Sequence, residues 1–597
     1  MRELLLPVLL LCTLCRASVQ YPYEESLGFR PLERNNLLAS FNFKINSSEF
    51  ELYEPEDKTF HYSTFSKLLG PILQDTNTRE LHLRFSQGWY DPEVYGELPY
   101  QGKHSGGTGV ELWAVVEGQN EETVFKDWIK LANCLSGLFC ASLNFIDTSS
   151  TTYPVTVFQP TAPMLAQNVS FRNDLFLLRS ALPREPVCTE NLTPFLKLLP
   201  TKGKAGISSL LTGHKVFNSQ WSSMSIDVTT HCSGTKCHYE MEQSINLILD
   251  VPMTLERNRM PIPKPTPGSQ LKCDPTKPFD AFHCFPLDDI SELEFSLADL
   301  FGKNIQGGAL LASQPTKVCA DLNLEYWSSE IQSQTKITPT LEDGKTCFAI
   351  EDTNEYNLLF KAKDTKKIKP LKSPPIFASR SLSGYSQDSG GFRIDLKNPT
   401  DEDSDIIIFE SIPWFVRIYL HTLTLTINST VTHVVADPQF DQYVKGIIYN
   451  PAIDRQKPSH LELLVSIPAH TKIKLSLEFD KAMLLYAEYP PDANHGFEIE
   501  PAVISVLDRN SHKVVYEMRT TTALLTLPTP DFSMPYNVII LTSTVMSLAF
   551  GSIFNLLTKK TVTEEEAELK LKESRITILR SRIKKCAQRI KSLIRRS

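Results

Sequence analysis

The sequence lacks the short motifs that mark common active sites. It contains no GxSxG nucleophile elbow, no HExxH zinc motif and no phosphate-binding P-loop, each of which holds reactive groups at a fixed spacing. No internal repeat is visible, and the net charge of −8 is the opposite of the basic balance typical of nucleic-acid-binding proteins. These absences argue against an enzyme of those classes, a repeat scaffold and a nucleic-acid partner.

Charged residues are missing from one long stretch, Tyr536–Leu557. A helix of this length spans about 33 Å, enough to cross the ~30 Å hydrocarbon core of a membrane. The residues that follow, from Lys559 to the end, carry 13 Lys/Arg and five Asp/Glu, so their net charge is +8 and that of the preceding chain is −16. The positive-inside rule therefore predicts a transmembrane helix at 536–557 and a basic cytosolic tail at 558–597.

The start of the chain has the pattern of a secretory signal peptide. Arg2 precedes an apolar run from Leu4 to Leu14, and small residues precede the expected cleavage site after Ala17. The run is too short to span a membrane, although an uncleaved anchor is the alternative. We expect a signal peptide at 1–17 and a single-pass type I membrane protein whose bulk is lumenal.

Hydrophobic patterns predict a mainly β protein with some helix. Residues 80–90 alternate as a half-buried strand, with Leu81, Leu83 and Phe85 on one face and His82, Arg84 and Ser86 on the other. Apolar spacing predicts a helix over 63–73, which Pro71 would end or kink, and a second helix from an Asn120 cap to about Gly137. The segment 140–146 is interpreted as a buried strand. Seven prolines predict an exposed loop over 251–280.

A basic, proline-bearing stretch at 361–375 predicts a domain boundary. We expect a β-rich lumenal domain at 18–370 and a lumenal β-sandwich at 371–530. In the second domain, two alternating runs within 416–427 change phase near His421-Thr422, which predicts a bulge or a corner between sheets.

The cysteine count points to a bond with another chain. Cys12 and Cys15 lie in the signal peptide and Cys586 in the tail, which leaves nine cysteines in an oxidising lumen. Because nine is odd, at least one is free or bonded to a partner. Cys188 follows two prolines and precedes the Asn191 glycosylation motif, so we expect it in an exposed loop and take it as the inter-chain candidate. The other eight give four candidate pairs: Cys134–Cys140, Cys232–Cys237, Cys273–Cys284 and Cys319–Cys347.

Several alternatives stay open for these sites. Cys188 could instead form an intrachain bridge or serve as a nucleophile, and His231-Cys232…Cys237-His238 has the outline of a zinc knuckle, although zinc needs reduced thiolates. Asp403-Ser404-Asp405 has the form of a sugar transferase's carboxylate pair, but it lies in a charge run typical of a solvated loop. We expect no catalytic residue, metal or cofactor. Glycosylation motifs occur at Asn46, Asn168, Asn191 and Asn428.

Two surfaces near the membrane are suited to contacts. Small or polar residues recur every fourth position along the predicted span, at Ser543, Ser547, Gly551 and Asn555, which favours close packing against other membrane helices. In the tail, apolar residues from Leu569 to Leu593 recur at helical spacing, and the opposite face of the same helix is basic. This predicts an amphipathic helix that lies on the membrane, packs on a partner, or only fixes topology.

Five segments together resemble one family. They are ELHLRFSQGWY (80–90), LSGLFCASLNFID (135–147), LPREPVCTENLTPFLKLLP (182–200), DANHGFEIEPAV (492–503) and LPTPDFSMPYNVI (527–539). The chain is similar in these segments to the phosphatidylinositol-glycan class T proteins, the non-catalytic T subunit of the GPI transamidase complex.

The resemblance implies a role in GPI-anchor biosynthesis at the endoplasmic reticulum membrane. That complex cleaves a C-terminal signal from proproteins and transfers the new carboxyl end to a GPI lipid, and a caspase-like subunit does the chemistry. The resemblance further implies that Cys188 is disulfide-linked to the catalytic subunit and that the chain stabilises the assembly beside other membrane subunits. Alternatives are a lumenal receptor for the proprotein tail or the GPI lipid, and an independent hydrolase or sugar transferase.

Overall fold

The computed structural model describes residues 22–594 apart from 54–63, 161–170, 234–235, 260–290, 310–311, 353, 385, 430, 490–494 and 530–532. The predicted signal peptide lies outside the described residues. The chain divides into two compact units, and the boundary between them along the sequence lies between Pro528 and Thr529. The first holds the strands and the second holds three helices, so the fold is mainly β with some helix, as predicted.

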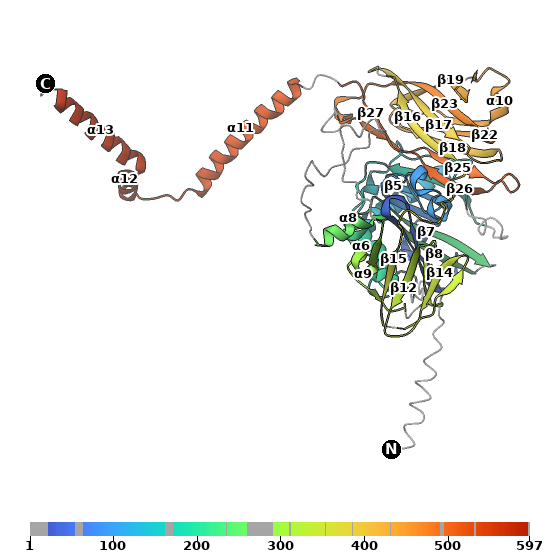
Figure 1. Ribbon diagram of the computed structural model, residues 1–597. Coiled ribbons are helices and arrows are strands. Elements are labelled where there is room, and N and C mark those ends of the chain that lie inside the picture. The colour runs from blue at the N-terminus through green and yellow to red at the C-terminus, as the bar shows by residue number, and fades with distance from the viewer. Residues whose placement is uncertain are drawn as a thin grey trace. The chain divides into compact units, whose positions relative to one another are not determined.

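The largest sheet dominates the first unit (Figure 1). Neighbouring strands of this sheet run antiparallel, except that β1 and β11 run parallel to each other. The short strand β3 (Phe50–Glu51) pairs with β8 beside the main strand order. In spatial order the other strands are β13 (Thr340–Glu342), β14 (Lys345–Ile350), β11 (Thr316–Ala320), β1 (Tyr23–Pro31), β2 (Asn36–Asn46), β8 (Lys236–Asp250), β7 (Trp221–Ser233), β4 (Thr78–Gly88), β5 (Gly109–Gly118) and β6 (Asp174–Leu182).

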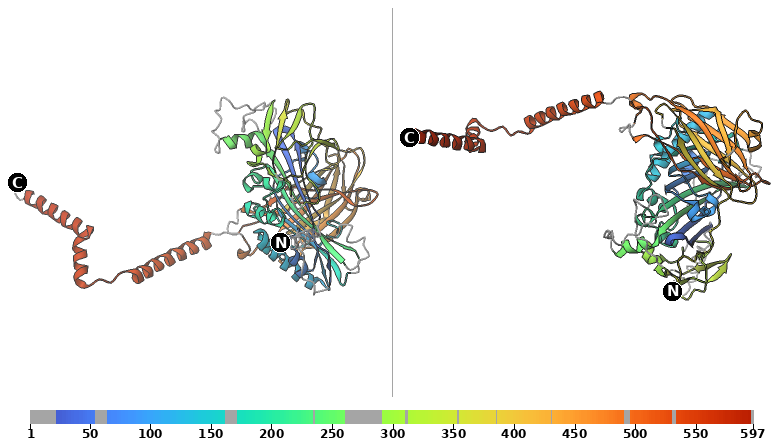
Figure 2. Two further views of the ribbon diagram at one scale, coloured as in Figure 1. Left: turned by 90° about the horizontal axis from the view of Figure 1, so that it is seen from below. Right: turned by 45° about the horizontal axis from the view of Figure 1, so that its top comes forward.

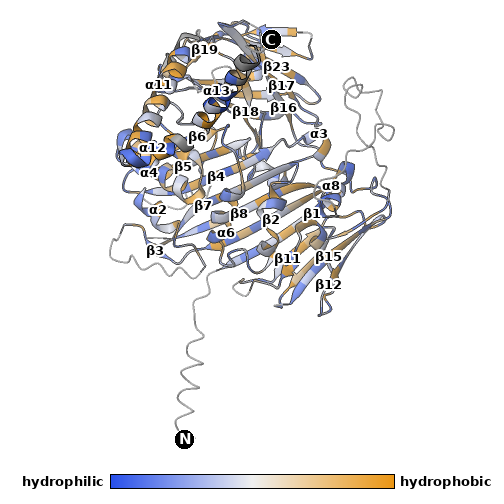
Figure 3. Ribbon diagram, turned by 90° about the vertical axis from the view of Figure 1, so that its left-hand side faces the viewer, coloured by the Kyte–Doolittle hydropathy of each residue, from blue (hydrophilic) through white to orange (hydrophobic). Residues whose placement is uncertain are grey.

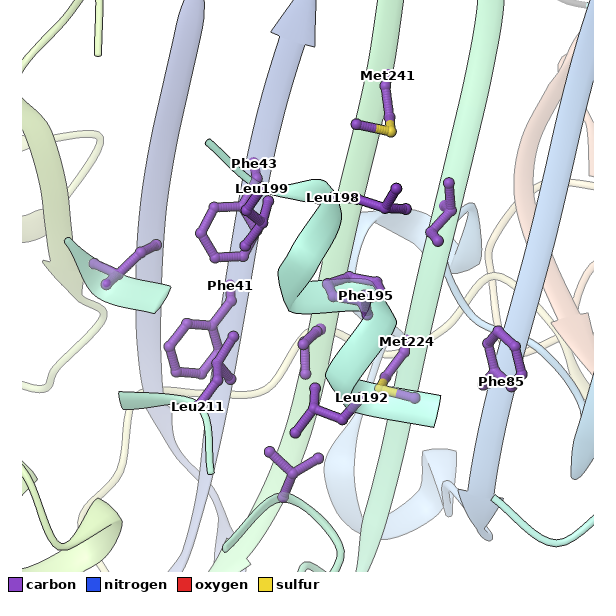
Figure 4. Close-up of a cluster of buried hydrophobic side chains, with 14 of the residues drawn as sticks. Phe41, Phe43, Phe85, Leu192, Phe195, Leu198, Leu199, Leu211, Met224 and Met241 are labelled. Carbon is purple, nitrogen blue, oxygen red and sulfur yellow. The ribbon is translucent and has the colours of Figure 1, made fainter. Parts of the chain in front are cut away.

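Helices cover one face of this sheet. The apolar side of α6 (Thr189–Leu198) rests on β2, β8 and β7, where Phe195 and Leu198 pack among Phe41, Phe43 and Met224 (Figure 4). The capped helix α4 (Glu121–Phe139) lies beside it and buries Trp128 completely. The remaining short helices of this region are α2 (Gly70–Asp75), α3 (Pro92–Tyr95), α7 (Gly213–Val216), η1 (Glu33–Asn35), η2 (Pro99–Gly102), η3 (Ser142–Phe145) and η4 (Ile207–Leu210).

A small sheet extends the same core. Phe360 of this sheet packs edge-on against Phe29 of β1 with ring centroids 5.4 Å apart, and Phe301 packs against Phe41 at 5.8 Å. The order is β10-β15-β12, with β9 beside β15. The elements are β9 (Leu293–Ser296), β10 (Ile305–Gln306), β12 (Trp327–Gln332), β15 (Glu355–Ala362), α8 (Val251–Arg259) and α9 (Leu297–Phe301).

Beyond residue 376 the first unit continues as two five-stranded antiparallel sheets (Figure 2). Ile394 and Leu475 of one sheet share a buried cluster with Ile408 and Leu463 of the other, so the two sheets pack face to face. One sheet is β16 (Phe377–Ser383), β17 (Ser389–Lys397), β23 (Lys472–Lys481), β19 (Val416–Ile427) and β20 (Val431–Val434). The other is β21 (Val444–Asn450), β22 (Ser459–Ile467), β18 (Ser404–Ile412), β25 (Val503–Leu507) and β26 (Val514–Arg519), and short elements are β24 (Phe497–Ile499), β27 (Ala523–Leu525), α10 (Phe440–Tyr443) and η6 (Tyr486–Glu488).

The phase change predicted in β19 is confirmed. Tyr419 pairs with Glu478 and Thr424 with Ser476, so four intervening residues of β19 oppose a single residue of β23. The register shift lets Ile418 and Leu425, at odds in simple alternation, both point into the core.

Three predicted elements need correction. The helix predicted over 63–73 begins only at Gly70, because Pro71 occupies its first turn, where the missing N–H costs nothing. The strand predicted over 140–146 is absent, and Ser142–Phe145 within this segment form the short helix η3. The start of the predicted 251–280 loop is helix α8, in which Pro252 again lies in the first turn, and residues 260–280 lie outside the described part.

Two further predictions differ from the structure, one in a helix end and one in the burial of a strand. Helix α4 passes through Gly137 and ends at Phe139, where Cys140 takes a left-handed conformation with φ 53°. Strand β4, predicted half-buried, is buried on both faces from Thr78 to Ser86.

The second unit contains α11 (Ser533–Thr558), α12 (Glu564–Glu573) and α13 (Arg575–Ile594). Tyr536–Thr558 is long and apolar enough to cross a membrane, which agrees with the predicted span. The predicted single tail helix is wrong, since the chain breaks at Ser574 into α12 and α13.

Candidate functional site

Cys188 lies at the N-cap of α6, directly before the first helical residue. Its backbone N–H donates to Oδ1 of Asn191 at 2.8 Å, and the Asn191 N–H donates to the Cys188 carbonyl at 3.1 Å. This reciprocal cap satisfies groups that a helix end leaves unpaired. Cys188 is therefore held in an ordered helix start and not in a free loop.

Asn191 also ties α6 to the end of α4. Its Nδ2 donates to the carbonyl of Phe139 at 2.9 Å and to that of Cys140 at 3.3 Å, and the residue is only 1% exposed. A glycan on Nδ2 does not fit this arrangement. The inference that the Asn191 motif exposes Cys188 is thus wrong in its premise, although the Cys188 side chain is partly exposed.

Two further contacts frame the Cys188 segment. Glu185 accepts a hydrogen bond from the Ser142 backbone N–H at 2.7 Å, just beyond α4. On the other side Gly213 approaches Thr189 so closely that an added Cβ would lie 2.5 Å from the Thr189 methyl group. Both flanks of Cys188 are fixed on structures that do not depend on the thiol itself.

The thiol of Cys188 donates to Glu190 Oε2 at 2.8 Å. Burial raises the pKa of this thiol, and the hydrogen bond to the Glu190 carboxylate raises it further. Catalytic cysteines need the reverse, a pKa lowered by cationic neighbours. The surroundings of Cys188 therefore lack the feature that activates a catalytic cysteine.

The structure joins two of the expected cysteine pairs, Cys232–Cys237 and Cys319–Cys347. Cys134, inside α4, and Cys140, at its end, both remain free thiols, so the expected bond between them is absent here. Cys273 and Cys284 lie outside the described residues. Cys140 is exposed and shares Asn191 with Cys188, which makes it a second thiol at the same end of α6.

The residues of the two other candidate sites, the zinc outline and the carboxylate pair, take part in a disulfide, a ring contact and an ion pair. The Cys232–Cys237 disulfide leaves no thiolate for zinc, and the rings of His231 and His238 stack at 5.4 Å. Asp403 pairs with Arg509 at 3.1 Å, which turns this carboxylate into a surface ion pair.

The remaining glycosylation motifs differ in exposure. Asn428 is exposed at the turn after β19, Asn46 is half-buried at the end of β2, and Asn168 lies outside the described residues. Along α11, the side chains of Ser543, Ser547 and Asn555 are exposed. A Cβ added at Gly551 would have no described atom within 4 Å beyond its own helix backbone and chain neighbours.

Sequence reasoning missed a buried charge cluster between β4, β7 and β8. Asp227 accepts from Arg84 at 2.5 Å, from His104 at 2.9 Å and from His82. The second ring nitrogen of His82 lies 2.8 Å from Glu80, and the ring stacks on Trp113 at 3.6 Å. Both nitrogens of His82 are thus occupied by carboxylates. Alternation had assigned His82 and Arg84 to an outer face, and no local signal shows that this face is covered.

Burial and charge oppose each other in this cluster. Burial alone lowers the pKa of His104, but hydrogen bonds to Asp227 and Glu242 outweigh it and raise the pKa to about 9. Burial would raise the pKa of Asp227, yet Arg84 and the two histidines hold it well below its usual value. The cluster therefore carries compensated charges at neutral pH.

A second network joins the large sheet to the five-stranded sheet that contains β22 and β26. Glu111 of β5 binds Arg519 of β26 at 2.6 Å and Arg179 of β6 at 3.1 Å, and Arg179 also pairs with Glu500. Glu111 and both arginines are almost fully buried. Nearby, Glu462 accepts the backbone N–H groups of Val155 and Thr156, each at 2.7 Å. Apart from the Arg179–Glu111 pair within the large sheet, these contacts link residues more than 300 positions apart and hold the first unit together.

Comparison with known proteins identifies the family. The sequence model of one protein family, described as Gpi16 subunit, GPI transamidase component, matches residues 7–584 of this chain. The GPI transamidase component GPI16 of Saccharomyces cerevisiae is 47% identical over 562 residues, 92% of this chain and 90% of that protein. The PIG-T homolog of Schizosaccharomyces pombe is 35% identical over 93% of each chain, and the GPI-anchor transamidase component PIGT of Homo sapiens is 31% identical over 91% of each. The resemblance drawn from the sequence is confirmed, and the chain belongs to the Gpi16 family of GPI transamidase components.

Proposed function

We propose that this chain is a non-catalytic structural subunit of the GPI transamidase and is disulfide-linked through Cys188 to the cysteine-protease subunit. Family membership supports the assembly, and the anchored Cys188 supports the link. A disulfide makes every other contact with the partner intramolecular, so modest interfaces suffice to hold the complex. A thiol already fixed at a helix cap loses little conformational freedom when that bond forms.

The proposal places the chain in the endoplasmic reticulum membrane with one span at α11. The residues before α11 are lumenal and include the 371–530 region as a β-sandwich domain. The residues after α11 are cytosolic, and other membrane subunits pack against the Ser543–Asn555 stripe. The positive charge after the span supports this orientation.

The test of the link compares two free thiols at the same end of α6. Complex carrying Cys188→Ser is expected to lose a reducible heterodimer on a non-reducing gel, while Cys140→Ser keeps it. Activity should weaken without disappearing, since the chain supplies assembly and not chemistry. An intact heterodimer in Cys188→Ser, or its loss only in Cys140→Ser, would overturn the assignment.

A second candidate function is recognition of the proprotein tail or the GPI lipid. The observation that favours it is a pocket between the large sheet and β26 whose walls include Trp89, Tyr90 and Trp221. Trp89 is 40% exposed beside this pocket and offers an aromatic surface to an apolar side chain. A photo-crosslinking residue at Trp89 should capture proprotein, while one at the equally exposed Tyr419 should not. Capture at neither position removes this candidate.

A further inference from the structure

Helix α13 carries an apolar stripe that none of the described residues of its own unit covers. Ile576, Leu579 and Ile583 are 60–69% exposed, and Cys586 continues the same line at the next helical step. Their spacing of three, four and three residues places them within one sector of the helix. Figure 3 shows these hydrophobic positions interleaved with hydrophilic ones along α13, whereas α12 is mostly hydrophilic.

The charge on α13 has one sign. Arg575–Ile594 contains seven Lys/Arg and no Asp/Glu. At about 100° per residue, Arg580 and Arg582 each lie about 80° from the centre of the stripe, on opposite sides. Thr577, Ser581 and Gln588 occupy the sector opposite the stripe together with Lys584 and Lys585, so the basic charge extends from the borders of the stripe around to the far side of the helix.

Basic residues along both borders of an apolar face are suited to a lipid surface. Their aliphatic stems lie on the apolar layer, and their charged ends reach the phosphate level. A pairing of two such helices would bring the basic borders together and repel. Sixteen residues separate α13 from the end of α11, so a bilayer crossed by α11 is always within reach.

We propose that α13 is an interfacial helix that binds anionic phospholipid on the membrane that α11 spans. The inference rests on α11 crossing a bilayer and does not depend on the role in the transamidase. Most of the stability of a protein helix comes from packing of its apolar face, so binding to the membrane also strengthens the folding of α13. Each basic residue near an anionic surface strengthens binding about fivefold.

The experiment uses the full-length chain in nanodiscs of phosphatidylcholine with or without phosphatidylserine. Amide hydrogen exchange over residues 576–588 is expected to be at least about tenfold slower with phosphatidylserine, and raised salt should remove much of the difference. Equal exchange in both nanodiscs overturns the proposal. So does protection that needs added partner subunits and ignores the lipid, because α13 would then pack on protein.

Matched variants separate the two contributions. Arg580→Gln with Arg582→Gln should abolish most of the protection, whereas Lys570→Gln with Lys572→Gln, which removes the same charge from α12, should leave it. Ile583→Ser should weaken protection in both nanodiscs, whereas Ile578→Ser, about 120° from the stripe, should not. Control variants as damaging as their test variants contradict the proposed face.

Discussion

At the scale of residues, side-chain polarity misleads where the fold supplies an unexpected partner. The sequence around Asn191 predicts a surface glycosylation site, yet its side-chain amide donates a hydrogen bond from α6 to the end of α4. His82 and Arg84 read as solvent-facing, yet both bind Asp227 under a covered face. These partners lie up to 145 positions away, so local patterns carry no trace of them.

Glycosylation should distinguish the motifs by accessibility. Thr193→Ala removes the Asn191 motif while keeping the Asn191 amide, and we expect no change in the mass lost on enzymatic deglycosylation. Asn428→Gln removes an exposed motif and should reduce that mass by one glycan. A glycan lost in Thr193→Ala would show that Asn191 is reached before α6 folds against α4.

The stability of the first unit should fall in mild alkali. The folded pKa of His104 is about 9 and its unfolded value is near 6.5, so its contribution is complete below pH 6.5 and is lost as pH rises through 9. The loss between pH 7 and pH 10 is about 2 kcal/mol. Denaturant unfolding of the chain should show this slope, His104→Gln should flatten it, and His470→Gln, at an exposed site, should not. An unchanged slope in His104→Gln would contradict the assignment.

At the scale of elements, the sequence predicted those with strong periodicity and clear caps. The Asn120 cap and the apolar face of α4 are both present, and the β19 phase change is a real register shift. Three of the errors concern proline and glycine. Pro71 and Pro252 lie in the first turns of helices, where proline is tolerated, and Gly137 lies inside a helix because tertiary packing outweighs its local preference.

Among the elements, α11 should act as an interface as well as an anchor. Ser547→Leu with Gly551→Leu fills the small-residue stripe and should weaken recovery of the other subunits without changing membrane insertion. Ala549→Leu with Ser552→Leu adds similar bulk on other faces of the helix and should leave recovery unchanged. Co-purification in mild detergent measures both. Equal recovery for the two double variants would leave α11 as an anchor only.

At the scale of the whole molecule, buried charges join the two groups of sheets. Glu111 lies between Arg179 and Arg519, and these arginines hold the pKa of the Glu111 carboxyl at about 2 against the opposing effect of burial. Such a network stabilises the joint only while every charge is compensated. The boundary predicted near residue 370 therefore falls within one compact unit.

Removing the central carboxylate should loosen this joint. Glu111→Gln leaves two buried guanidinium groups short of charge and should cost about 3–5 kcal/mol in unfolding free energy. Glu121→Gln breaks the exposed Lys457–Glu121 pair across the same joint and should cost under about 1 kcal/mol. Thermal unfolding of the full chain measures the difference. Similar effects for both variants would show that the buried network adds no special stability.

The central claim is that Cys188 bonds this chain to the catalytic subunit. The most direct measurement is mass spectrometry of the intact complex, alkylated at once to block exchange and digested without reduction. We expect the peptide containing Cys188 to be joined to a peptide of the cysteine-protease subunit, with Cys140 alkylated. Recovery of Cys188 alkylated, or joined to Cys140 of the same chain, would contradict the account.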